Sequence, residues 1–326
     1  MKEKGENDFI IIEASSCIGG RIHTIGQIDN CPIEMGATWF NRSHTNLIKL
    51  LEKLAIETFP QKMGDKVIYE PSSSSDPYFA TMPPNDYPSL RIKGGTSTLI
   101  DTLAQEIGIN KIHTSEKVTS IRKTKEGVEV ITDKNHYLAD KVITTLPPNL
   151  LINSIDFSPA LPQDLIDIAT RTHTWMGESI KVALTFKSPF WTTVNSTATI
   201  FSNVGPITEM YEHNNYEGSF FALKGFINPD LYTFSKQERE KLLLDQLRKY
   251  YGPIVDKEFL SYHEKIWRKE KLTFQPYSSM VYAHQNNGHQ FYQKSFWDNR
   301  LMISGSETSL VHPGYMEGAV WSGRNI

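Results

Sequence analysis

The chain has 326 residues, 39% hydrophobic, 22% charged and 11% aromatic, which suits one large domain or two interleaved ones. Its net charge of -3 gives no electrostatic basis for binding nucleic acid or an anionic membrane, and no apolar run is long enough to span a bilayer. The polar N-terminus is no secretory signal, and two cysteines, Cys17 and Cys31, are too few for a disulfide scaffold, so we expect a reduced, cytoplasmic protein.

The first half of the chain shows strand and helix patterns in turn. Residues 9–13 predict a short buried strand, and residues 44–56 predict a helix with leucines on one face. Residues 60–90 lose periodicity and are rich in serine and proline, which predicts a loop-rich connector. A helix is expected over 97–107, followed by an antiparallel meander over 112–146 that closes on an apolar strand.

The second half continues with a strand and two helices. Residues 180–186 alternate in a way that predicts a strand with one buried face. Residues 236–250 predict a helix that stops at Gly252-Pro253, and a final helix is expected from about Gly314. This order predicts a mixed α/β chain whose segments are interleaved.

Three tracts near the N-terminus have the chemistry of a dinucleotide site. Glu13 ends the first strand, where an acidic residue can bind ribose hydroxyls, although a lone strand-end glutamate is more often only solvated. Gly19 and Gly20 would let the backbone approach a pyrophosphate, and Arg21 would neutralise it. Small residues over 36–39 would let a flat ring lie against the backbone.

Two tracts at the other end complete the pattern: Gly305-Ser306-Glu307-Thr308, and Gly314-Tyr315-Met316 at the start of the expected helix. Together, the tracts at both ends resemble the flavin-containing amine oxidase family, the monoamine and polyamine oxidases and their bacterial relatives. The resemblance covers nearly the whole chain and is weakest at 60–90 and 192–235.

The resemblance implies an α/β (α+β) fold in two units. One is a discontinuous FAD/NAD(P)-binding Rossmann-like domain, truncated at its N-terminus, and the other is a smaller substrate domain with a mixed sheet. The FAD-binding domain is expected to comprise residues 1–60, 91–160 and 262–326, and the substrate-binding domain residues 61–90 and 161–261.

FAD is the cofactor that the resemblance implies. Pro276 stands where some members carry the cysteine that bonds flavin, so we expect noncovalent FAD. The helix near Gly314 would point its amides at the flavin pyrimidine carbonyl, and Glu307 resembles the acid near the ribityl and pyrophosphate groups. The residues implied in cofactor binding are Glu13, Gly19, Gly20, Arg21, Gly36, Ala37, Thr38, Trp39, Val118, Trp267, Gly305, Glu307, Tyr315 and Met316.

Lys181 is the first of three residues implied in catalysis. It lies in the predicted strand 180–186, followed by Pro189-Phe190-Trp191 at the spacing of the family segment whose lysine holds a water at flavin N5. A desolvated lysine there would orient water for imine hydrolysis or flavin reoxidation. The alternative is an exposed strand lysine.

Tyr277 and Tyr315 are the other two residues implied in catalysis. Trp267 precedes Tyr277 by a spacing that resembles the family's, and the two tyrosines match the aromatics that stand face to face before the flavin. Such rings would attract an amine nitrogen. The alternative is two buried tyrosines of a packed core.

The chain departs from the family at two places. The glycine-rich turn that should precede Glu13 is absent, and our hypothesis is that Met1 is an internal methionine of a truncated gene or gene model. The long helical insertion of larger members is also absent over 60–90, which resembles the compact bacterial members.

The sequence therefore predicts a flavin-dependent oxidoreductase that acts on a small-molecule amine, binds no nucleic acid and has no membrane span. It does not predict the oligomeric state. His284 and His289 lack a carboxylate at ligand spacing, so we expect no metal. Two alternatives remain: a flavin desaturase or isomerase of an apolar substrate, and a non-catalytic remnant unable to hold FAD.

Overall fold

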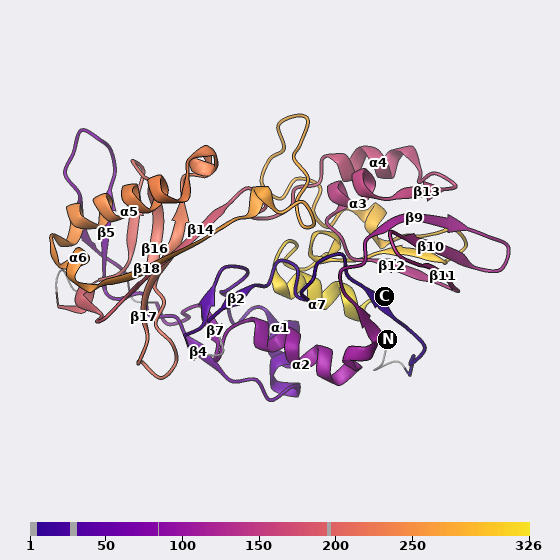
Figure 1. Ribbon diagram of the computed structural model, residues 1–326, viewed down its shortest axis with the longest axis horizontal. Helices are drawn as coiled ribbons and strands as arrows, with labels where there is room; N and C mark the ends of the chain where they lie inside the picture. Colours follow the sequence, from indigo (N-terminus) through magenta and orange to yellow (C-terminus); the bar gives the residue numbers. More distant parts are fainter. Residues whose placement is uncertain (1–4, 27–30, 84, 194–196) are drawn as a thin grey trace.

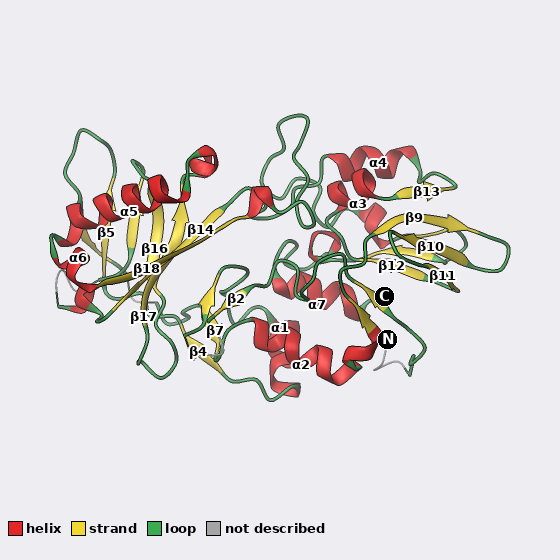
Figure 2. Ribbon diagram, viewed as in Figure 1, coloured by secondary structure: helices red, strands yellow, loops and turns green. Residues whose placement is uncertain are grey.

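The computed structural model of the chain describes residues 5–26, 31–83, 85–193 and 197–326. Its elements form an elongated molecule with a large sheet at one end and smaller sheets at the other (Figure 1). The helices α1, α2 and α7 lie in the middle part, away from the helix α5 that covers the large sheet (Figure 2). Their bounds are Thr45–Lys53 for α1, Ser97–Ile107 for α2, Met316–Arg324 for α7 and Lys236–Tyr251 for α5.

The large sheet has seven strands in the order β18-β14-β17-β16-β15-β5-β6. Helix α5 stops at Gly252, as the sequence predicted. It begins with a capping box between Ser235 and Glu238, and its leucines pack on one face of the sheet. The short helix α6 (Ile254–Glu258) follows. The strands are β5 (Lys66–Glu70), β6 (Tyr78–Thr81), β14 (Ile180–Phe186), β15 (Ile200–Ser202), β16 (Ile207–Glu212), β17 (Phe221–Ile227) and β18 (Phe259–Ile266).

Strand β14 has the predicted bounds, but the prediction of one buried face is wrong. All seven of its residues are buried. Ile180 and Val182 pack in the cluster under α5, whereas Ala183 packs on the other face against Ile33 and Met35. The N-terminal segment thus covers the face that a one-sided sheet would leave to solvent.

The prediction of a loop-rich connector over 60–90 is wrong for part of that segment. Residues 66–70 and 78–81 form the strands β5 and β6, and β5 pairs in parallel with β15. Val67 and Ile68 are buried in this arrangement. A strand whose partner lies more than 100 residues away leaves little local pattern, because its burial depends on that partner. The antiparallel pair β4 (Thr58–Pro60) and β7 (Leu90–Ile92) flanks the segment.

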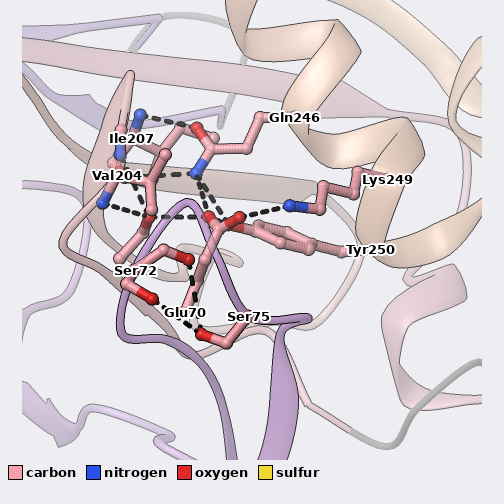
Figure 3. Close-up of polar contacts among 10 residues, drawn as sticks. Glu70, Ser72, Ser75, Val204, Ile207, Gln246, Lys249 and Tyr250 are labelled. Atoms are coloured by element: carbon pink, nitrogen blue, oxygen red, sulfur yellow. Dashed lines mark hydrogen bonds and ion pairs between the residues drawn. The ribbon is translucent and has the colours of Figure 1, made fainter.

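Glu70 at the end of β5 joins the sheet to α5 (Figure 3). Its carboxylate accepts hydrogen bonds from the Tyr250 hydroxyl at 2.5 Å and the Ser202 hydroxyl at 2.7 Å, and it pairs with the Lys249 ammonium. Burial raises the pKa of Glu70, but the bonds from Lys249, Tyr250 and Ser202 outweigh it and lower that pKa. This buried charge is fully satisfied by its neighbours.

The smaller sheets contain the predicted meander and the closing strand. The four-stranded sheet has the order β11-β10-β9-β13, and the three-stranded sheet β12-β20-β19 joins the middle of the chain to its C-terminal part through the parallel pair β12 and β20. Helices α3 (Pro148–Ser154) and α4 (Gln163–Thr170) pack on this region. The strands are β9 (Val118–Lys123), β10 (Val128–Thr132), β11 (His136–Ala139), β12 (Val142–Thr144), β13 (Asp156–Ser158), β19 (Ser295–Phe296) and β20 (Leu301–Ile303).

The first strand is shorter and more exposed than predicted. Strand β1 (Ile11–Ile12) pairs in parallel with β8 (Ile112–His113). The prediction of a buried strand over 9–13 is wrong, because Ile10 and Ile11 expose 44% and 41% of their surface. Within the described residues β1 has one strand neighbour, so its other edge is not covered by a sheet.

Helix α7 supports the predicted helix α1 directly. Glu317, which is fully buried in the first turn of α7, accepts hydrogen bonds from the backbone nitrogens of Asn46 at 3.1 Å and Leu47 at 2.7 Å. These are amide donors of the first turn of α1, which no intrahelical carbonyl can satisfy. A side chain from the C-terminal end of the chain therefore caps a helix of the N-terminal part.

Candidate functional site

Arg21 and Glu307 join the two ends of the chain. The Arg21 guanidinium donates to both Glu307 oxygens, at 2.5 and 2.8 Å, and to the Ser306 hydroxyl at 2.9 Å. Glu307 exposes 1% of its side chain and Arg21 exposes 27%. Burial raises the pKa of Glu307, but the nearby Arg21 charge outweighs it and holds that pKa below its usual value.

Glycines near Arg21 allow the tracts 19–21 and 36–39 to approach each other closely. Gly19 and Gly20 have φ angles of 109° and 57°, in the region that favours glycine. A Cβ on Gly36 would lie 2.3 Å from the Arg21 carbonyl oxygen, so only glycine fits there. The Ala37 nitrogen donates to that same carbonyl at 3.0 Å. The predicted tracts 19–21 and 36–39 are thus one structural unit.

Trp267, from the short helical turn after β18, anchors the segment between β3 (Ile33–Glu34) and Trp39. Its indole nitrogen donates to the Met35 carbonyl oxygen at 2.9 Å. Strand β3, which precedes the segment, pairs with β2 (Thr24–Ile25). Trp267, which follows a strand of the large sheet, therefore contacts the backbone beside Gly36.

Lys181 is buried against this same segment. It exposes 5% of its surface, and its Nζ donates to the Gly36 carbonyl oxygen and, at 3.3 Å, to the Thr38 hydroxyl. Its ammonium lies 5.5 Å from the Trp39 ring centre and 5.1 Å from that of Phe226. Burial lowers the pKa of Lys181 to about 8. The alternative of an exposed strand lysine is therefore wrong.

Lys224 is a second buried lysine at this place, and the sequence analysis missed it. Its side chain is fully buried on β17, its Nζ donates to the Thr38 hydroxyl, and it lies 4.3 Å from the Trp39 ring centre. Burial and the neighbouring Lys181 charge hold the pKa of Lys224 well below its usual value. One signal was available, a lysine in the otherwise apolar run 221–227.

Tyr277 and Tyr315 belong to one cluster of rings but have different neighbours. Tyr277 stacks on His173, with ring centres 6.3 Å apart, and its hydroxyl accepts from the Thr174 nitrogen at 2.6 Å. Tyr315 lies 5.7 Å from Trp175, which in turn lies 6.1 Å from His173. The ring contacts therefore link the two tyrosines through His173 and Trp175, which the sequence analysis did not select.

An open pocket of about 380 Å³ lies between this ring cluster and the large sheet. Its lining includes His173 and Trp175 on one side and Glu209 and Phe226 of the sheet on the other. Burial raises the pKa of Glu209 above its usual value. A larger pocket of about 710 Å³ is lined by Lys123 and Arg300 among others. None of the predicted site residues lines either pocket.

The other predicted residues contact different parts of the fold. Glu13 makes local hydrogen bonds, its carboxylate accepting from the Ser15 nitrogen at 2.7 Å. Val118 opens β9 and packs against the core of the smaller sheets. Gly305 has a φ of 138° before the Ser306–Thr308 turn, and Met316 begins α7 and packs against α1.

Comparisons with known proteins identify the family of the chain. The model of a family described as flavin containing amine oxidoreductase matches residues 1–84 and 79–326. The chain belongs to that family. Among relatives, "Probable flavin-containing monoamine oxidase A" of Dictyostelium discoideum is 29% identical over 246 residues, 72% of this chain and 52% of that protein. Amine oxidase [flavin-containing] B of Homo sapiens is 29% identical over 238 residues, 71% of this chain and 45% of that protein.

The chain spans about half the length of these curated relatives. A putrescine oxidase solved with putrescine bound has a similar structure, with a TM-score of 0.81 at 20% identity over 97% of this chain and 91% of that one. At this identity the likeness shows the fold, a mixed helix and sheet architecture of the FAD-dependent amine oxidases.

FAD is the cofactor of this family, and the residues at the junction of the two chain ends fit it. A Cβ on Gly20 would meet no atom within 4 Å, so the backbone there is open. Arg21 keeps 27% of its side chain exposed beside it. An open glycine next to a guanidinium suits a pyrophosphate.

The described residues offer neither a cluster of metal ligands nor a helix that could span a membrane. They contain no group of three or more histidine, cysteine, aspartate or glutamate side chains that could hold a metal ion. No helix in the described ranges has both the length and the apolar character needed to cross a membrane.

Proposed function

We propose that the chain is an FAD-dependent oxidoreductase that oxidises a small amine. FAD would supply the hydride acceptor, taking hydride from the amine α-carbon at N5 and returning the electrons to oxygen or another acceptor. The observation that supports the proposal most is the buried Lys181, whose Nζ donates to Gly36 and Thr38 in the predicted cofactor tract.

The proposed role of Lys181 is to hold a water for hydrolysis of the imine product. With a pKa lowered to about 8, its Nζ can donate a hydrogen bond at neutral pH and give up a proton at modest cost. Its contacts with Gly36 and Thr38 would fix that nitrogen in place.

Tyr277 and Tyr315 would bind and orient the amine together with the rings between them. The faces of aromatic rings attract a cationic or partly positive nitrogen, and Trp175 and His173 line the pocket beside them. Glu209, on the opposite wall of that pocket, would add a negative charge or a hydrogen-bond acceptor for the same nitrogen.

The cofactor would be held noncovalently, because Pro276 leaves no thiol at the position before Tyr277. Arg21 would face the pyrophosphate and Glu13 the ribose. We further propose that Gly19, Gly20, Gly36, Ala37, Thr38, Trp39, Val118, Trp267, Gly305, Glu307, Tyr315 and Met316 surround the cofactor.

The test is purification followed by anaerobic titration. We expect a yellow protein whose visible absorption bleaches with an amine and not with an apolar polyene. Bleaching by the polyene alone would favour the desaturase alternative, and a colourless folded protein would favour the remnant.

A matched pair of variants then tests the role of Lys181. Lys181→Met should retain the yellow colour and slow turnover by at least about a hundredfold, the low end for loss of one proton-transfer group. Lys265→Met removes a lysine of β18 in the same sheet, which pairs with Glu270. The turnover of this variant should match that of the wild type. Equal turnover in the Lys181 and Lys265 variants would exclude Lys181 from the reaction.

A further inference from the structure

Lys181 and Lys224 are neighbours on the same face of the large sheet. In the antiparallel pair of β14 and β17, Lys181 lies opposite Phe226 and Ala183 lies opposite Lys224. Opposite residues share a face, and every second residue of a strand returns to that face. The two lysines therefore stand diagonally across adjacent strands, both on the side covered by the segment 33–39.

Both lysine nitrogens depend on the same hydroxyl. The Thr38 hydroxyl donates to the Gly36 carbonyl oxygen at 3.1 Å, and its oxygen accepts from Lys181 and from Lys224. A hydroxyl oxygen has two lone pairs, so both are used. Within the described ranges, neither Nζ has a carboxylate at ion-pair distance, although both side chains are almost fully buried.

Other charged and titratable groups face the pair from the surrounding elements. They are Glu34 of β3, Arg91 of β7, Glu209 and Tyr211 of β16, His213 just after it, and His263 and Lys265 of β18. Glu34 is occupied by the Thr96 nitrogen at 2.5 Å and the Thr24 hydroxyl at 3.0 Å. The Glu34 and Glu209 charges raise the pKa of Lys181, and the Glu34 charge raises that of Lys224, but burial outweighs them.

Two ammonium groups in this position would repel each other in a low-dielectric interior with no carboxylate beside them. We propose that Lys181 and Lys224 hold one proton between them at neutral pH, and that Lys224 is a positioning residue that keeps one of the two amines unprotonated. The lowered pKa values of both lysines, caused first by burial, agree with this arrangement. Such a pair titrates as a unit.

This inference deepens the proposed function, because it places a base beside the predicted flavin tract without using a carboxylate. An unprotonated Nζ at Thr38 could accept a proton from a substrate ammonium, leaving a neutral substrate amine, or from water, leaving hydroxide. In either case the lysine becomes an ammonium that later returns its proton to solvent. Lys181 would meanwhile keep its hydrogen bond to Gly36.

The first test needs neither flavin nor activity. Urea unfolding is measured in steps between about pH 6.5 and pH 7.5, where the unfolded chain carries both protons and the folded pair carries one. Folded stability therefore rises with pH, and the pair makes the unfolding equilibrium constant fall by about tenfold per pH unit. Lys224→Met should lose this fall, because Lys181 is then protonated in both states.

Two further variants control the result. Lys181→Met should also show a smaller fall, because Lys224 without its neighbour regains a proton, while Lys265→Met should keep the wild-type slope. Burial and then the Arg91, Lys224 and Lys181 charges lower the pKa of His213, so all slopes are compared in a His213→Asn background. Equal slopes in the wild type, Lys224→Met and Lys181→Met would overturn the one-proton pair.

The second test uses protein that carries FAD. The acid limb of the pH profile for anaerobic bleaching by an amine should move up toward about pH 8 in Lys224→Met, where Lys181 titrates alone. Lys224→Arg, which places a permanent charge beside Lys181, should move the limb down. If the unfolding constant falls about tenfold per pH unit but no amine bleaches the flavin, the proposed function is rejected and the one-proton pair stands. If bleaching is normal but its acid limb lies at the same pH in the wild type and both Lys224 variants, the pair alone is rejected.

Discussion

The large sheet buries charge at two places in opposite ways. Near its edge strand β6, the Glu70 carboxylate contacts Lys249 and Tyr250 (Figure 3). It also accepts a hydrogen bond from the Ser202 hydroxyl. Near the opposite edge, on β14 and β17, Lys181 and Lys224 share one hydroxyl and have no carboxylate at ion-pair distance among the described residues.

The difference separates a structural charge from one that costs stability. A buried charge with several donors around it ties elements together, here β5, β15 and α5. A buried charge without a partner lowers the stability of the fold, and such groups are common where chemistry takes place. The next changes test whether the two places differ in this way, from the largest expected effect to the smallest.

Glu70→Leu should lower the free energy of unfolding by about 3 kcal/mol, because it removes the carboxylate that accepts from the Lys249 ammonium and from the buried Tyr250 and Ser202 hydroxyls. Urea unfolding at neutral pH measures the change. Glu70→Gln keeps one acceptor oxygen and should cost less than Glu70→Leu.

Acid should abolish the difference between the wild type and Glu70→Gln. The pKa of Glu70 is lowered in the folded protein. Its charge therefore stabilises the fold above the pKa of an unfolded glutamate, about 4.3, and this effect is lost as the pH falls through the lower pKa of the folded state. A difference that persisted in acid would show that the carboxylate charge is not what joins β5 to α5.

Thr38→Val should destabilise the protein by about 2 kcal/mol, because it removes the one acceptor that both lysine nitrogens share while keeping the side-chain shape. Thermal or urea unfolding is the measurement. The matched control is Thr185→Val, which removes a different buried threonine hydroxyl. Thr185 lies on β14, and its hydroxyl bonds to that of Ser261 at 2.7 Å. If the two valine variants unfold alike, Thr38 has no special part in holding the lysines.

Lys224→Met should change stability in the other direction and raise the free energy of unfolding by about 1 kcal/mol at neutral pH, because an apolar side chain of similar length replaces a buried amine without a carboxylate partner. The measurement is urea unfolding beside Glu70→Leu. A loss as large as that of Glu70→Leu would mean that both buried charges stabilise the fold, and the contrast between the two places would fail.

Glu57→Gln should leave the free energy of unfolding unchanged within error, because the Glu57–Lys93 pair lies at the surface and surface ion pairs contribute little. Unfolding in low and high salt checks it. A clear loss at low salt would show that exposed pairs also contribute here, and Glu70 would no longer be distinctive.

Local patterns predicted much of the fold. The helix over 97–107 and the strand over 180–186 appear with the predicted bounds, because leucine spacing along a helix and alternation along a strand are properties of consecutive residues. The tracts around Arg21 and Glu307 were also selected from sequence, since glycines and charged residues in fixed order leave a local signature.

Other features depended on partners far along the chain. Strands β5 and β6 lie in a segment predicted as loop, and the buried second face of β14 is covered by residues 33–35. Lys224 and the rings of His173 and Trp175 had no motif around them, so only their neighbours in space mark them.

The sequence by itself determined the family and the short-range elements, because glycine tracts, capping residues and periodic leucines act within a few residues of each other. Only the tertiary structure decided that one charge, Glu70, is fully paired while two others, Lys181 and Lys224, meet at a single hydroxyl. Burial and electrostatic interaction depend on distances between strands, and those distances are set when β14 and β17 come together beneath the N-terminal segment.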